Sequence, residues 1–116
     1  MRNDIIKQLD EIVFHDVPVE NFLIKSDSIN ELHIDFLLYN ETTKDYQKHT
    51  LKFLNIIESK FNSLVINKNT DFELNSFDYS FNDYFYCKLT FLLGFGEPSF
   101  DIELKVENIE LITKNE

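Results

Sequence analysis

The stretch Tyr84–Leu111, YFYCKLTFLLGFGEPSFDIELKVENIEL, contains two long runs in which alternate residues are apolar, on either side of the only two glycines in the chain. From Phe100 to Val106, every even position is apolar and every odd position is charged. This period of two is typical of strands with one buried and one solvated face. The segment Gly94–Pro98 favours a turn between the two runs. We therefore predict a hairpin of an antiparallel sheet in which Tyr84–Leu93 is a central strand.

The same kind of pattern predicts further strands earlier in the chain. The segment Leu54–Phe61 fits either the end of a strand or a short helix or turn, because its apolar residues satisfy both spacings. Shifts in the phase of the alternation at Asn75-Ser76 and at Asn108 indicate β-bulges. The predicted strands before Tyr84 are Val19–Ile24, Glu31–Tyr39, Gln47–Ile57, Leu64–Ile66 and Asp71–Phe81.

The N-terminal segment has a different period. Apolar residues in Asp4–Phe14 recur at helical spacing, and Asn3 or Asp4 is suited to cap the helix N-terminus. The turn after it contains Pro18, which disfavours helical geometry in the residue before it. The 116 residues contain no linker rich in Gly, Ser or Pro. We predict one α+β domain, residues 1–116, with a short N-terminal helix and a predominantly antiparallel sheet of six to eight strands in one or two layers.

The chain is acidic, with 21 Asp and Glu residues, 11 Lys and Arg residues and a formal charge of -10. This charge argues against nucleic acid as a partner, because phosphates require clustered cations, and it favours a basic protein. Cys87 is the only cysteine and lies in an apolar run, where a thiol behaves as a small buried hydrophobe. The sequence has neither a signal-peptide pattern nor the roughly 20 apolar residues of a membrane span. We expect a cytoplasmic protein that does not bind membranes.

Several residue pairs could carry chemistry. His15-Asp16 could orient a base, but neighbouring residues rarely face each other, and a metal site built from all three histidines would require an unusual fold. The carboxylate pairs Asp71/Glu73 and Asp101/Glu103 each lie on one strand face about 6–7 Å apart. That spacing suits glycosidase or metal chemistry, but it is equally that of a solvated strand. Because no nucleophile motif or phosphate loop accompanies them, we predict no catalytic activity, no cofactor and no metal.

A more informative combination is two tyrosines beside acidic residues. Tyr84 and Tyr86 lie on the less apolar face of their strand, next to a strand that carries Asp101, Glu103 and Glu107. Tyrosine rings offer rigid contact area, and carboxylates steer a basic partner. These five residues are the predicted partner-binding site. The alternative is that the N-terminal helix packs over this face and buries both rings.

The order of the predicted elements carries a resemblance. A short helix, then Phe14-His15-Asp16, a turn and alternating strands that end in Phe100–Leu104 and Ile109–Leu111 resemble small β-rich bacterial proteins. These include immunity proteins of polymorphic toxin systems, and the similarity spans Phe14–Leu111. The resemblance implies a non-catalytic protein that neutralises a cognate, often basic, toxin by binding it.

The sequence leaves two other possibilities open. The 12 phenylalanines could line a pocket for a small ligand instead of filling a packed core. Alternatively, an edge strand could pair with a second copy, so that the chain is either a monomer or a small homo-oligomer.

Overall fold

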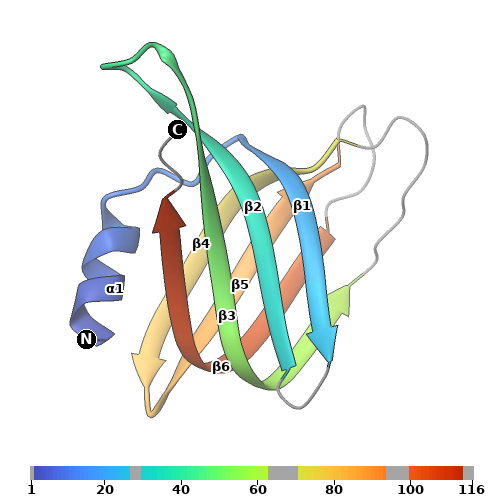
Figure 1. Ribbon diagram of the computed structural model, residues 1–116. Helices are drawn as coiled ribbons and strands as arrows, with labels where there is room; N and C mark the ends of the chain where they lie inside the picture. The colour runs from blue at the N-terminus through green and yellow to red at the C-terminus, as the bar shows by residue number, and fades with distance from the viewer. Residues whose placement is uncertain (1, 27–29, 63–70, 94–99, 114–116) are drawn as a thin grey trace.

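The computed structural model describes residues 2–26, 30–62, 71–93 and 100–113 (Figure 1). Within these ranges the chain forms one helix and six strands, which confirms the predicted α+β class with a predominantly antiparallel sheet. The predicted strand Leu64–Ile66 and the predicted turn Gly94–Pro98 lie outside the described residues. The elements are α1 (Arg2–Asp10), β1 (Val17–Ser26), β2 (Asn30–Asn40), β3 (Asp45–Asn62), β4 (Glu73–Asn82), β5 (Tyr84–Leu92) and β6 (Phe100–Thr113).

The six strands form a closed barrel in the order β1-β2-β3-β6-β5-β4, so the sheet is a single layer that curls on itself. Every pair is antiparallel, and β5 lies between β4 and β6 as expected for the central strand. The closing pair is short, because β1 meets β4 only at Val17–Leu74 and Pro18–Glu73 within the described residues. The amide of Val19 adds a 3.0 Å hydrogen bond to the carbonyl of Phe72.

Bulges give the strands the curvature that closure requires. The predicted bulge at Asn75-Ser76 is confirmed by a register shift between Leu74 and Ser76. The bulge predicted at Asn108 is misplaced. Glu107 and Asn108 do both face solvent, but the extra residue lies in the facing strand, between Ile56 and Glu58.

The barrel interior is filled mainly by aromatic and branched side chains that alternate along each strand. Their packing explains the high phenylalanine content, since each ring buries a large apolar area. The largest fully buried rings are Phe36, Phe53, Phe85, Phe91 and Phe100. Cys87 is buried among them, as predicted.

The segment Leu54–Phe61 is part of β3, which resolves the alternative between strand and helix in favour of strand. Its irregular spacing has a local cause: a register shift lies between Ile56 and Glu58, and Asn55 has a positive φ of 55°. Asn is one of the few residues that tolerate this conformation. The extra residue of the bulge shifts the phase of the alternation, so the apolar residues no longer follow a period of two.

The N-terminal helix is shorter than predicted, ending at Asp10 instead of Phe14. Leu9 is fully buried in the core, and α1 packs beside β6 (Figure 1). The Tyr79 hydroxyl of β4 donates a hydrogen bond to the Asp10 carboxylate. Beyond the helix, Phe14 packs against the rings of Phe36 and Phe77. The helix therefore ends at Asp10, and the segment after it places the Phe14 ring against the barrel core.

Candidate functional site

The outer face of β4, β5, β6 and β3 carries two cross-strand rows of polar side chains. In the first row, charge alternates from strand to strand through Asp78, Lys88, Glu103 and Lys60. The second row is Ser80, Tyr86, Lys105 and Glu58. Directly opposite residues in an antiparallel pair lie about 4.5–5.5 Å apart at Cβ, so the members of each row are neighbours on the surface.

These rows line a hollow of about 860 Å³ on the surface. Tyr86 is one of its two aromatic lining residues and is 43% exposed. We call this region the hollowed face. It is lined by Glu58, Ser59, Lys60, Asp78, Tyr79, Ser80, Tyr86, Cys87, Lys88, Glu103, Leu104 and Lys105.

Lys105 connects the two predicted tyrosines. Its ammonium lies 4.9 Å from the centre of the Tyr84 ring and 5.8 Å from that of Tyr86. Tyr84 is half-buried and lines a neighbouring hollow of about 620 Å³ together with Glu107. The Glu107 carboxylate accepts a 3.0 Å hydrogen bond from the side-chain amide of Asn55.

The structure thus brings four of the five predicted residues, Tyr84, Tyr86, Glu103 and Glu107, into two hollows joined by Lys105. Asp101 is half-buried and lies one strand repeat beyond Glu103, opposite Thr90. The alternative in which the helix buries both rings is wrong for Tyr86, because α1 packs beside β6 and that ring is exposed.

The predicted acidic face also carries several cations. Three lysines, Lys60, Lys88 and Lys105, line the hollow together with three carboxylates, those of Glu58, Asp78 and Glu103. Period-two alternation identified the acidic residues of the last strand. It did not reveal that the neighbouring strands place Lys88 and Lys60 opposite Glu103, because that depends on register.

The histidines lie in separate environments. The His15 ring lies 3.3 Å from the Asp16 carboxylate, so the expectation that these neighbours do not face each other is wrong. The positive φ of Asp16, 54°, accompanies this contact. His33 lies 2.8 Å from Glu31, whereas His49 is buried and stacks on Phe36. Within the described residues, no three His, Cys, Asp or Glu side chains are grouped so that they could hold a metal ion.

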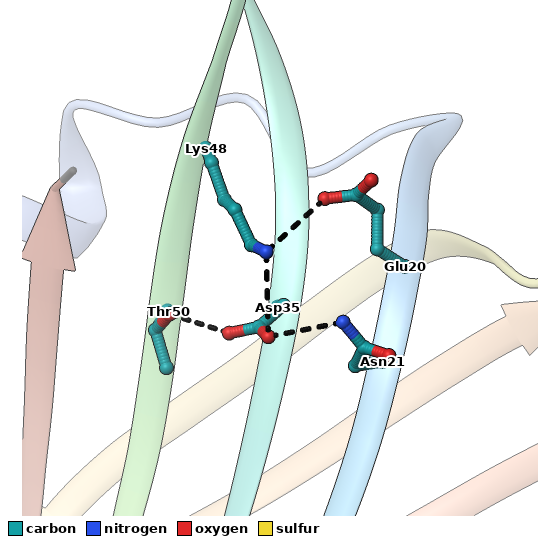
Figure 2. A network of polar contacts seen from close by, with 5 residues as sticks. All are labelled: Glu20, Asn21, Asp35, Lys48 and Thr50. Carbon is teal, nitrogen blue, oxygen red and sulfur yellow. Dashed lines mark hydrogen bonds and ion pairs between the residues drawn. The ribbon is translucent and has the colours of Figure 1, made fainter. Parts of the chain in front are cut away.

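A polar network on β1, β2 and β3 was not identified from the sequence (Figure 2). Asp35 of β2 accepts hydrogen bonds from the Thr50 hydroxyl and, at 3.2 Å, from the Asn21 amide. Lys48 lies 3.9 Å from Asp35 and 3.6 Å from Glu20. The bulge between Val19 and Asn21 brings both Glu20 and Asn21 to the outer face. Because the cluster depends on a bulge, its residues do not lie at a fixed spacing that could be recognised in the sequence.

An apolar pocket of about 310 Å³ lies beside β1. Its aromatic wall is formed by Phe22, Phe61, Phe72 and Phe100, and Val19 and Ile24 complete the apolar lining. Phe22 meets the rings of Phe72 and Phe91 edge to face at 5.3 and 5.1 Å. Part of the phenylalanine content therefore lines a pocket, while the rest fills the core.

Protein-family models, curated proteins and solved structures give no match. The helix within the described residues is too short and too polar to cross a membrane. Inferences about function therefore depend on the surface itself.

Proposed function

We propose that this protein is a non-catalytic binding module that recognises a basic partner protein through the hollowed face. The observation that carries the proposal is the exposed Tyr86 ring in a hollow of about 860 Å³, with Lys105 between it and Tyr84. Tyrosine is enriched among residues that dominate binding energy, because a large rigid ring loses little entropy on contact.

Charge acts at two ranges in this proposal. The overall charge of -10 attracts a basic protein over distances of several Å and raises its association rate. Inside the hollow, lysines and carboxylates alternate, so the contact itself requires a partner with both signs of charge. This pattern adds specificity, because the three lysines of the hollow would repel a partner surface that carries only basic side chains.

The test uses the purified chain to capture a partner, followed by binding measurements with the purified partner. Tyr86→Ala should weaken binding at least tenfold, and Glu103→Lys should slow association and reduce its salt dependence. Glu110→Lys is the matched control, because it makes the same charge change on the same strand at an exposed position outside the hollowed face. A purified partner that binds Tyr86→Ala and Glu103→Lys with unchanged affinity would contradict the proposal.

Neutralisation of a toxin, the role implied by the resemblance to immunity proteins, is one form of such binding. If the captured partner is a toxic enzyme, an equimolar amount of the chain should abolish its activity. The Tyr86→Ala variant should then require a higher concentration for the same effect.

The apolar pocket supports a second candidate function, the binding of a small apolar ligand. At about 310 Å³ the pocket is at the lower end of the range for small-molecule sites, which suits a single ring or short acyl chain. An apolar dye should bind the native chain, and Val19→Phe, which fills the pocket, should abolish that binding. Leu92→Phe adds the same ring at an exposed position and serves as the control. A dye that does not bind the native chain would exclude this function.

A further inference from the structure

The β2–β3 hairpin extends beyond the barrel and carries a pair of exposed tyrosines near its tip (Figure 1). Tyr39 and Tyr46 are direct cross-strand partners, with ring centres 5.4 Å apart and an edge-to-face angle of 75°. They are 53% and 57% exposed. Two large rings held together on a projecting element are unusual on a surface that only contacts water.

The turn that follows Tyr39 is held by its own side chains. The Asn40 carboxamide oxygen accepts hydrogen bonds from the amides of Thr42, at 2.9 Å, and Thr43, at 3.3 Å. Lys44 adopts a positive φ of 55°, and the Tyr46 amide donates to the Asp45 carboxylate at 2.8 Å. The rings are therefore presented by an ordered turn, which lowers the entropy lost on binding.

The base of the hairpin is also fixed. Below the tyrosine pair on the same outer face, Leu37 faces Lys48, and Asp35 faces Thr50. Lys48 and Asp35 belong to the network in Figure 2, which ties both hairpin strands to β1. The projecting arm is thus connected to the barrel by hydrogen bonds and ion pairs at its base.

Charge at the tip defines the chemistry of the partner. Glu41 and Asp45 are exposed on the turn and outnumber its only cation, Lys44. The faces of tyrosine rings also attract cations, most effectively the guanidinium of Arg. A convex acidic tip with two rings is complementary to a concave basic site.

We propose that the hairpin tip inserts Tyr39 and Tyr46 into a cleft of a partner protein whose rim carries Arg or Lys side chains. This surface lies at the opposite end of β3 from Ser59 and Lys60 of the hollowed face. The inference depends on the proposed function only in requiring that the chain binds a protein. It does not require the hollowed face to be the contact.

The test places the photoreactive residue p-benzoylphenylalanine at position 39 or 46 of the full chain, in the cells that produce it. We expect one cross-linked protein from both positions and none from position 110 on β6. That protein is then purified, and its affinity for the unmodified chain is measured. The double variant Tyr39→Ala/Tyr46→Ala should bind it at least tenfold more weakly, whereas Tyr39→Phe/Tyr46→Phe should retain most of the affinity.

Three outcomes would overturn the inference: no adduct at positions 39 and 46, an adduct only with a second copy of the chain, or unchanged affinity of the double alanine variant. The variants also separate the two proposals. A partner that loses affinity with Tyr86→Ala but not with the double alanine variant refutes the hairpin and supports the hollowed face. The reverse pattern refutes the hollowed face and supports the hairpin.

Discussion

The ammonium of Lys105 on β6 lies 4.9 Å from the centre of the Tyr84 ring on the neighbouring β5. The two residues are offset by two positions along the strands, since Lys105 pairs directly with Tyr86. The long lysine side chain thus contacts both tyrosines on this face. The faces of both rings attract the Lys105 ammonium, so the three side chains form one cluster on this face.

The Lys105–Tyr84 contact should be measurable as a coupling energy. A double-mutant cycle with Lys105→Met and Tyr84→Leu should give a coupling energy of about 0.5–1 kcal/mol in the free energy of unfolding, the usual range for a cation–π pair that stays in contact with water. Urea unfolding of the four proteins provides the measurement. Strictly additive effects would show that the contact contributes nothing to stability.

Replacing Asp35 should destabilise the barrel. Asp35→Ala removes an acceptor from the nearly buried Thr50 hydroxyl and separates Lys48 from one of its two carboxylates. Loss of these partners should lower the free energy of unfolding by about 1–3 kcal/mol. Glu110→Ala, a carboxylate at an exposed strand position, is the control and should change stability little. Equal unfolding midpoints for the two variants would contradict the structural role of the network.

Stability should fall in mildly acidic solution because of His49. Burial lowers the pKa of His49 below its ordinary value of 6.5, so the ring stays neutral in the folded chain at pH values where the unfolded chain takes up a proton. Stability is therefore lost as the pH falls below about 6.5, the pKa in the unfolded chain. The replacement His49→Phe keeps an aromatic ring beside Phe36 and removes this contribution.

The measurement compares urea midpoints at pH 7.5 and pH 5.5. The wild type should lose more stability between these values than His49→Phe does. Phe91→Leu, a core replacement without a titratable group, is the control and should show the same pH dependence as the wild type. An identical loss in wild type and His49→Phe would show that His49 does not contribute.

The thiol of Cys87 should be unreactive in the folded protein. Burial raises its pKa to about 12, so at pH 8 the reactive thiolate is scarce as well as inaccessible. A disulfide reagent such as 5,5′-dithiobis(2-nitrobenzoate) should label the native chain much more slowly than the chain in concentrated urea. Labelling at equal rates in both conditions would mean that the core around Cys87 opens readily.

Local alternation predicted the individual strands well where one face is buried and the other solvated. Phe100–Val106 is the clearest case, with apolar residues inside and charged residues outside throughout. The pattern was ambiguous at Leu54–Phe61, where a bulge and a residue with positive φ interrupt the alternation of the strand. It also extended the helix past Asp10, because the apolar side chain of Phe14 follows the barrel core and not a helix face.

The sequence by itself determined the class of fold, the acidic character of the chain and the presence of tyrosines and carboxylates on exposed strand faces, since these depend on composition and on a period of two. Only the tertiary structure decided that the sheet closes into a barrel, that lysines alternate with the carboxylates around Tyr86, and that Tyr39 meets Tyr46 on a projecting hairpin. These features depend on strand register and on bulges. Register joins residues far apart in the chain, and a shift of one position would move every side chain to the other face.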